Sequence, residues 1–425
     1  MARCRVDQSI ERVVRDGFAF PLGVYPVEEL TPKPGYTTAF ESADGDDDPG
    51  ITGGPGGGGK FGGTGGSGGS GGGGKSRDAD DDDDGPMPSG EWEEWPDRYV
   101  FDILVPATRI ESLCRALFAI LPGRVYPILD FLGQDEWREV DPYVSYELIG
   151  LDRFLEALRR FRGFFFEDGL VGFGAMSEEP FMYVFIDEHK VVTVRVQSDM
   201  KERVEGVLAA FDLEEVDELT SADSVTHEHR AVLDTPDDRR DLLNAEEIVE
   251  ALRDDWRMVL NIDPESNVDE EGNDLGTTGW RCILRYDPPP PATPPSSSKK
   301  SESTRKKKGE GRDDKDTPES GDSDPDAAPP ADSPVPMELP EPRYAHIFLT
   351  ADSLNRATEL AVEGLEALLN REEKDAPDPD LPVSDPFLVQ ADRWGEADFI
   401  REVETVTGKK PDLHKMAVWF SEWLQ

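Results

Sequence analysis

The sequence is poor in three things, namely cysteine, basic side chains and long apolar runs. Its 425 residues include 3 cysteines, Cys4, Cys114 and Cys282, which lie too far apart for a Cys-x-x-Cys metal site and cannot all pair as disulfides. Lys and Arg number 45 against 91 Asp and Glu, which gives a formal net charge of -46. Such an acidic chain repels nucleic-acid phosphates and anionic lipid head groups. We therefore expect no nucleic-acid partner and no membrane partner.

The absence of long apolar runs bears on location. No stretch approaches the roughly 20 apolar residues that a membrane-spanning helix needs. The start of the chain, MARCRVDQSIERVVRDG, carries charges where a signal peptide needs an apolar core. Together with the scarcity of cysteine, these features predict a soluble, cytoplasmic protein in a reducing compartment.

Glycine and proline, in contrast, are abundant, with 40 and 35 residues, and many of them fall in two biased segments. Segments without apolar periodicity cannot repay the entropy of ordering, so we expect them to be disordered. The resulting organisation is a docking segment at 1–40, a Gly/Asp-rich tether at 41–97, an α+β domain at 98–220, a Pro-rich charged linker at 288–342, and a second α+β domain, interrupted by that linker, at 221–287 and 343–425.

The expected ordered parts alternate short strands with amphipathic helices. The apolar run 98–106 predicts a strand, and Thr108 to Glu111 matches a capping box that would open a helix. Residues 181–197 are predicted to form two strands joined by a turn at Asp187 to Lys190, and Asn244 to Glu247 form a second capping box. This pattern predicts an α+β fold, with antiparallel sheets covered on one face by helices, in a broadly ferredoxin-like arrangement.

The stretch RRFRGFFFEDG, from Arg159 to Gly169, combines arginine with aromatic residues. Arginine is favourable at the negative end of a helix, and glycine commonly follows the last helical residue. We therefore expect a helix that Gly163 stops, followed by a buried strand.

Two well-known patterns match within the expected Gly/Asp-rich tether. Residues 69–76 fit the phosphate-loop pattern G-x-x-x-x-G-K-[ST], and Asp80, Asp82, Asp84 and Glu91 fall at positions of a calcium-loop pattern. A phosphate loop needs a buried strand before it and a helix after it, and a calcium loop needs two clasping helices. Neither context is present, so we interpret both matches as products of composition. We expect no cofactor here, and loose cation association with the four acidic candidates instead of a tight metal site.

The catalytic candidates are Asp187 and Glu188, which follow the apolar stretch Tyr183 to Ile186. An apolar strand that ends in Asp-Glu resembles the strand that holds magnesium in some NTPases. The alternative is a hairpin turn, which the alternating strand that resumes at Val191 favours.

Histidine offers one further pattern, His227-Glu-His229, in which two imidazoles would share one face of a strand and could bind zinc. The sequence indicates no third ligand, so a solvated loop is the favoured interpretation, and His189 stands alone. Cys114 and Cys282 lie at apolar positions and are expected to be core residues.

No catalytic constellation is visible in the segments expected to be ordered. We therefore expect a non-catalytic acidic interaction or scaffold protein, whose partner is another protein. The alternative is a hydrolase or NTPase that uses Asp187 and Glu188.

Overall fold

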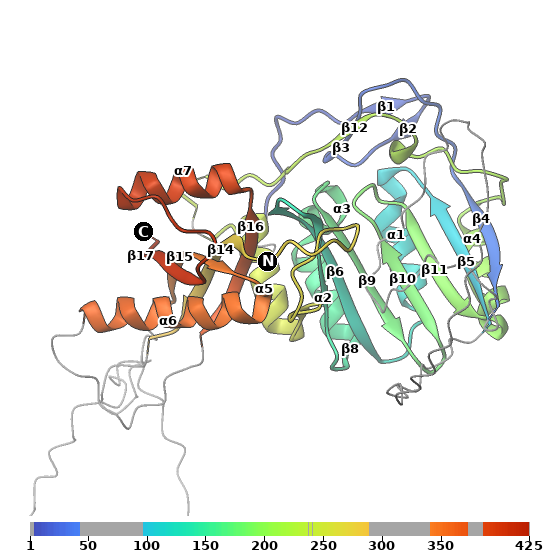
Figure 1. Ribbon diagram of the computed structural model, residues 1–425. Helices are drawn as coiled ribbons and strands as arrows, with labels where there is room; N and C mark the ends of the chain where they lie inside the picture. Colours follow the sequence, from blue (N-terminus) through green and yellow to red (C-terminus); the bar gives the residue numbers. More distant parts are fainter. Residues whose placement is uncertain are drawn as a thin grey trace, which may run out of the picture. The chain divides into compact units, whose positions relative to one another are not determined.

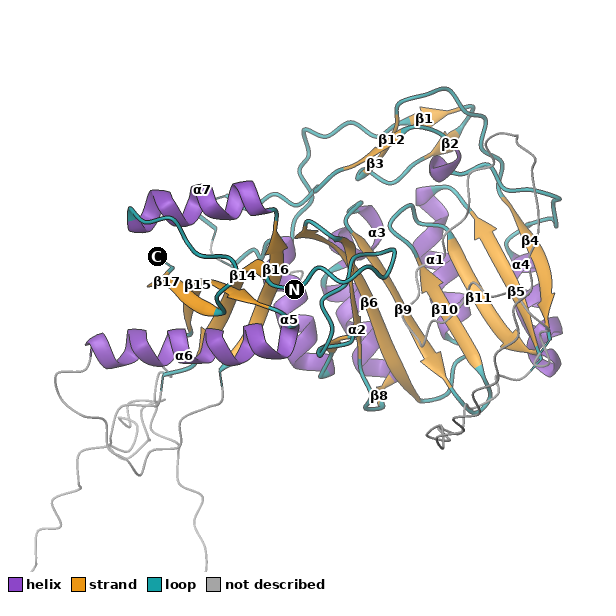
Figure 2. Cartoon of the chain, viewed as in Figure 1, coloured by secondary structure: helices purple, strands orange, loops and turns teal. Residues whose placement is uncertain are grey.

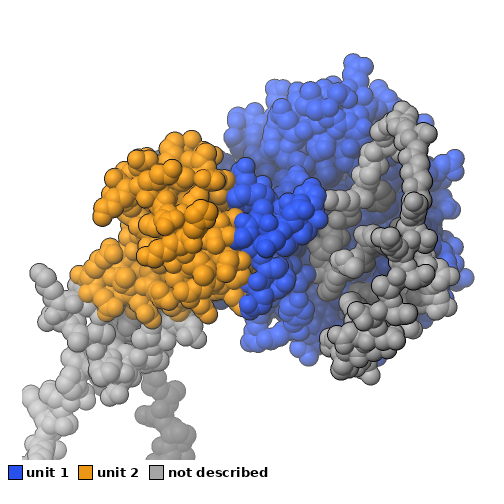
Figure 3. Space-filling model, viewed as in Figure 1, with its two compact units in different colours: residues 1–276 blue, residues 277–425 orange. Residues whose placement is uncertain are grey.

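The computed structural model describes residues 4–42, 97–236, 238–239, 241–288, 341–372 and 386–424. The chain divides into two compact units, residues 1–276 and 277–425 (Figure 3). Both combine antiparallel sheets with helices (Figure 2), which confirms the expected α+β class. The phosphate-loop and calcium-loop matches, and nearly all of the two expected tethers, lie outside the described residues.

Unit 1 is built on a nine-stranded antiparallel sheet (Figure 1). Eight strands follow one another in the order β13 (Val259–Leu260), β7 (Arg138–Val144), β6 (Arg124–Asp135), β9 (Val171–Ser177), β10 (Met182–Ile186), β11 (Val192–Gln197), β5 (Arg98–Leu104) and β4 (Gly35–Glu41). The ninth, β8 (Ile149–Gly150), pairs with β6. Residues 187–190 form the turn between β10 and β11, as the sequence predicts.

The helices of unit 1 pack on the face of the sheet to which Phe173, Val184 and Val194 point. They are α1 (Ala107–Phe118), α2 (Leu151–Arg160), α3 (Arg162–Glu167), α4 (Lys201–Ala210), preceded by the 3₁₀ turn η1 (Ser198–Met200), and α5 (Ala245–Trp256). Buried side chains of the sheet and of all five α-helices form one apolar core. No described helix has the length and apolar character that crossing a bilayer requires.

Helix α5 belongs to this first core. The ring of Trp256 lies 5.2 Å from that of Phe154 in α2 and 6.2 Å from that of Phe165 in α3. The compact units thus group residues 221–276 with the first unit, which differs from the domain boundary that the sequence suggests at 221.

The expected helix ends are confirmed in one place and wrong in two. Asn244 forms the predicted capping box, with Glu247 N donating to Asn244 Oδ1 at 2.7 Å and Asn244 N donating to Glu247 Oε2 at 2.9 Å. Helix α1 instead begins at Ala107 after Pro106, without a side-chain cap. Gly163 does not stop a helix either, because it lies inside α3, whose aromatic residues Phe164, Phe165 and Phe166 are all buried in the core. Burial of three rings outweighs the roughly 1 kcal/mol cost of a helical glycine.

The N-terminal residues form a layer with residues 221–234. The elements of this layer are β1 (Val14–Arg15), β2 (Phe18–Ala19), β3 (Val24–Pro26), the 3₁₀ turn η2 (Ala222–Ser224) and β12 (His227–His229). Strand β3 pairs with β12, and Phe18, Phe20 and Val24 join Leu104 at the end of β5 in a small apolar cluster.

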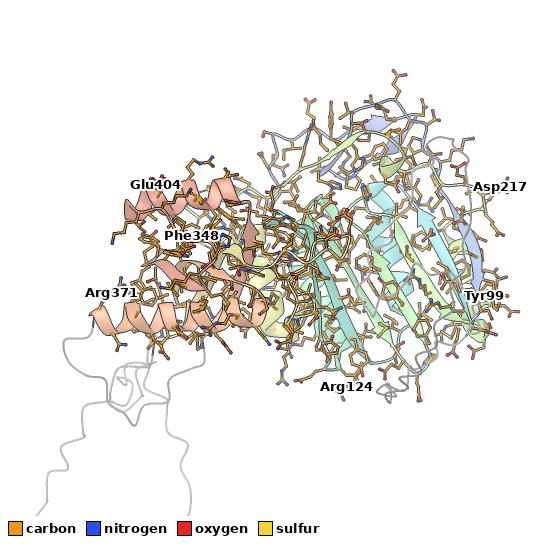
Figure 4. The ribbon with its side chains drawn as sticks, in the orientation of Figure 1. Tyr99, Arg124, Asp217, Phe348, Arg371 and Glu404 are labelled. Carbon is orange, nitrogen blue, oxygen red and sulfur yellow. The ribbon has the colours of Figure 1, made fainter. Side chains whose placement is uncertain are left out.

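Unit 2 has a four-stranded antiparallel sheet in the order β16 (Phe387–Trp394), β14 (Thr278–Tyr286), β15 (Arg343–Ala351), β17 (Ala417–Trp423), with helices α6 (Leu354–Glu372) and α7 (Glu396–Thr407). Phe348 of β15, labelled in Figure 4, packs on Phe399 of α7. Its neighbour Ile347 points to the opposite face, where it lies against Gly364 of α6. The two helices therefore cover opposite faces, whereas a ferredoxin-like arrangement predicts one covered face.

Replacing Trp256 by alanine tests whether α5 stabilises unit 1. We expect Trp256→Ala to lower the free energy of unfolding by about 3–5 kcal/mol, because the removed ring leaves a cavity among buried aromatic side chains. Val259→Ala is the control, since Val259 is 48% exposed, and it should change stability by less than about 0.5 kcal/mol. Denaturant unfolding followed by circular dichroism measures both. Equal, small effects would contradict the assignment of α5 to this core.

Candidate metal centre

Three histidines converge at the end of the unit 1 sheet. His189 lies in the turn between β10 and β11, and His227 and His229 are alternate residues of β12, so both point to the same face of that strand. The Nε2 atom of His227 lies 2.9 Å from Nε2 of His189 and 3.2 Å from Nε2 of His229. One nitrogen from each ring lies within 4.8 Å of the other two.

Two of the rings are held by backbone carbonyl groups. His227 Nδ1 lies 2.8 Å from the oxygen of Val225, and His229 Nδ1 lies 2.8 Å from the oxygen of Gly169. A carbonyl oxygen only accepts hydrogen bonds, so each Nδ1 must carry the proton and donate it. In the neutral ring, the lone pair is then on Nε2.

The third ring lies beside two carboxylates. His189 Nδ1 lies 3.5 Å from Glu188 Oε1 and 3.6 Å from Asp187 Oδ2. Burial alone would lower the pKa of His189, but the neighbouring carboxylates, Asp187 foremost, outweigh it and raise that pKa. Asp187 is itself fixed, because Val191 N donates to its Oδ1 at 2.7 Å. In the neutral ring, this arrangement also favours a proton on Nδ1 of His189 and a lone pair on Nε2.

When all three rings are neutral, their three lone pairs lie close together, which is unfavourable unless a proton or a metal ion lies between them. A single added proton can bridge one of the two close Nε2 pairs and leaves the other unrelieved. Burial, reinforced by the charge of His189, lowers the pKa of His229 to about 4. Because Zn–N bonds are ~2.0–2.1 Å long, tetrahedral ligands lie ~3.3 Å apart, close to the 2.9 and 3.2 Å separations of these Nε2 atoms. The donor set thus fits a transition-metal ion that prefers imidazole.

The strand that carries two of these histidines is positioned by a close crossing of three backbone segments. Gly23 N donates to the carbonyl of Glu167 at 2.7 Å, Arg230 N to that of Gly23 at 2.8 Å, and Gly169 N to that of Arg230 at 3.2 Å. A Cβ atom built on Gly23 would lie 2.0 Å from Gly169 N. Glycine at both positions therefore permits the approach that brings the Gly169 carbonyl to His229.

Asp168 also stabilises this backbone crossing. Its side chain is fully buried, and it accepts hydrogen bonds from Leu170 N at 2.9 Å and from Val232 N at 3.0 Å. Burial raises the pKa of this carboxyl, and the two backbone donors oppose that shift. Residues 229–232 are thereby tied to the turn that follows α3.

The centre is partly open to solvent. The side chain of His189 is 13% exposed, and those of Asp187 and Glu188 are 32% and 25% exposed. Solvent therefore reaches the carboxylate side of His189.

Several residues singled out in the sequence meet here. Asp187 and Glu188 do lie in a hairpin turn, on the Nδ1 side of His189 and away from the converging Nε2 atoms. The solvated loop expected at His227 and His229 is wrong, since both residues lie in a strand and are partly buried. The third ligand was missed because 38 residues separate His189 from His227, although its place in a turn beside two acids was visible.

The other candidates do not contribute to this centre. Asp80, Asp82, Asp84 and Glu91 lie outside the described residues. Cys114 and Cys282 are buried in the two cores, as expected, and burial raises the pKa of both thiols, which makes them unreactive.

No family model, no curated protein and no solved structure matches this chain. The chemistry of the site therefore has to be argued from its own residues.

Replacing Gly23 by alanine tests the backbone crossing. We expect Gly23→Ala to lower the free energy of unfolding by about 1–3 kcal/mol, because the added methyl group cannot fit against the backbone of Gly169 without shifting it. Gly206→Ala is the matched control: nothing lies within 4 Å of the added atom, and a helical Gly→Ala change should stabilise by about 0.5–1 kcal/mol. Denaturant unfolding of both variants decides. A Gly23→Ala protein as stable as the wild type would refute the role of the crossing.

Proposed function

We propose that this protein is a metal-dependent hydrolase that binds a divalent transition-metal ion, zinc foremost, through Nε2 of His189, His227 and His229. The observation that carries the proposal is the convergence of three Nε2 lone pairs whose Nδ1 atoms face oxygen atoms. Metal-bound histidines characteristically donate their other N–H to a carbonyl or carboxylate oxygen in this way.

The number of ligands supports a catalytic site over a structural one. Structural zinc sites have four protein ligands, whereas catalytic sites have three and leave one coordination position open. Within the described part of the chain, no fourth His, Cys, Asp or Glu side chain joins the group. A zinc ion bound in such a site lowers the pKa of a coordinated water toward 7 and so supplies a nucleophile for hydrolysis.

The remaining residues orient the ligands. The carbonyl groups of Val225 and Gly169 fix the tautomers of His227 and His229. Asp187 and Glu188 lie beside Nδ1 of His189, where their negative charge makes that imidazole a stronger donor to the ion. The hydrolase suggested by the sequence is thus retained, with these two acids as positioning residues instead of groups that touch the substrate.

Titration of the metal-free protein with Co²⁺, followed by its visible absorption and by calorimetry, tests the centre. We expect one ion per chain and a tetrahedral spectrum. His227→Ala should weaken binding by more than the ~10–100-fold typical of losing an outer partner. His414→Ala is the control, because that histidine is exposed and outside the group. Equal binding by wild type and His227→Ala would overturn the proposal.

Asp187→Asn tests the outer carboxylate separately. The amide keeps an oxygen for Val191 N but loses the negative charge, so the affinity for Co²⁺ should fall ~10–100-fold while one ion still binds. Calorimetric titration of the variant at one fixed pH measures the change. An unaltered affinity would show that Asp187 serves the turn alone.

Hydrolysis by the zinc-loaded protein tests the reaction itself. Using p-nitrophenyl acetate, p-nitrophenyl phosphate and a peptide anilide as probes, we expect turnover of at least one, lost in His227→Ala and retained in His414→Ala. Tight one-to-one metal binding without hydrolysis of any probe would contradict the enzyme and favour the scaffold expected from the sequence, with the ion linking β12 to the β10–β11 turn.

A further inference from the structure

Beside the histidines, the face of the unit 1 sheet that the five helices leave uncovered has an unusual composition. Strand β9, which lies between β6 and β10 (Figure 1), contributes Gly172 and Gly174 to this face. The Phe185 ring of β10 lies across both: a Cβ atom on Gly172 would meet its Cζ at 2.8 Å, and one on Gly174 would meet its Cδ2 at 2.9 Å. Tyr183 stacks on Phe185, with ring centroids 5.9 Å apart and planes inclined by 21°. Two partly exposed rings with nearly parallel planes therefore form an aromatic floor, of which the Phe185 ring lies over the glycines of β9.

At the end of this floor nearest the histidines lies a carboxylate with one unpartnered oxygen. Asp130 of β6 pairs with Gly172, and the next residue of β9, Phe173, pairs with Ile186, which directly precedes Asp187. Its Oδ1 atom is buried and has no hydrogen-bond partner among the residues that the structure describes. Burial, with a smaller contribution from Glu188, raises the pKa of Asp130 to about 7. A buried acceptor without a donor costs about 1–3 kcal/mol, which a ligand that donates a hydrogen bond would recover.

At the other end lies an unpaired cation. The guanidinium of Arg195 lies 5.4 Å from the centroid of the Tyr183 ring, and its Nε is buried without a hydrogen-bond partner in the described part of the chain. On the same face of β11, the hydroxyl of Thr193 donates to Asp102 Oδ1 at 2.7 Å. The buried Nε of Arg195 lacks an acceptor among the described residues, and an anion would supply one.

We propose that Asp130, Tyr183, Phe185 and Arg195 form a binding site for a small amphoteric molecule with a flat body. Its amine donates to Asp130, its carboxylate accepts from Arg195, and its body stacks on the two rings. Pairing of both orphan groups by one ligand satisfies a donor and an acceptor that the protein leaves unmatched. This inference rests on the proposed function, because a substrate of this class would also carry the ester or amide bond that the metal centre would hydrolyse, giving an acid and an alcohol or amine.

The separation of the two charges defines the size of the ligand. Asp130 lies on β6 and Arg195 on β11, with β9 and β10 between them, and the guanidinium of Arg195 lies 5.4 Å from the centroid of the Tyr183 ring. The amine and the carboxylate of the ligand must therefore lie at opposite ends of a body at least one aromatic ring long. We choose 4-(aminomethyl)benzoate as the probe, with benzylamine and 4-methylbenzoate as its two half-probes.

Calorimetric titration of these probes tests the site. The amphoteric probe should bind at least about tenfold more tightly than either half-probe, because each charge-assisted hydrogen bond is worth ~1.5–3 kcal/mol. Asp130→Asn should remove the advantage over 4-methylbenzoate, and Arg195→Gln the advantage over benzylamine. Circular dichroism verifies that both variants fold, and Asp102→Asn, on the same face, is the control that should retain the advantage.

A further variant separates this inference from the metal centre. His229→Ala should lose Co²⁺ binding and keep probe binding, whereas Asp130→Asn should do the reverse. Absence of probe binding in a protein that binds Co²⁺ would overturn the recognition site alone. A probe that binds no better than its halves, or whose affinity neither substitution changes, would overturn it as well.

Discussion

The hydrogen bond from His229 Nδ1 to the carbonyl oxygen of Gly169 is the interaction on which the proposed chemistry depends. This bond sets the tautomer of His229, and the corresponding bond from His227 Nδ1 to the carbonyl oxygen of Val225 sets the tautomer of His227. Because both acceptors belong to the backbone, the fold itself fixes which nitrogen carries the proton. The same contacts that hold the rings therefore direct their lone pairs at one point, together with that of His189.

This arrangement requires main chains to approach more closely than side chains normally allow. Gly23 and Gly169 meet with no room for a Cβ atom, and on the sheet Gly172 and Gly174 leave room for the ring of Phe185. In both places the absence of a side chain on glycine lets another group, the backbone of β12 or the ring of Phe185, come close to the main chain. The N-terminal layer is thus part of the site, since β3 holds β12 in register with His227 opposite Pro26 and His229 opposite Val24.

The sequence was informative where the causes are local. The capping box at Asn244 needs only four consecutive residues, and the turn at Asp187 follows from the alternation on either side of it. Gly163 misled because its local preference to end a helix is overridden by the burial of three adjacent phenylalanines, which depends on the rest of the core. The proposed metal centre could be predicted only in part, since the spacing of His227 and His229 indicates two candidate ligands, whereas His189 joins them through the pairing of β12 with β3 and the crossing at Gly169.

The net charge of the chain affects which ligands can approach the proposed metal centre and the sheet face beside it. A chain with a formal net charge of -46 attracts divalent cations and repels anionic substrates. A molecule that carries one positive and one negative group has no net charge, so this long-range field does not exclude it. Recognition then depends on short-range pairing with groups that the protein leaves unmatched, and Asp130 and Arg195 are such groups on either side of one aromatic floor. The acidity that argues against nucleic acid and membranes is thus compatible with both the cation and the amphoteric ligand proposed here.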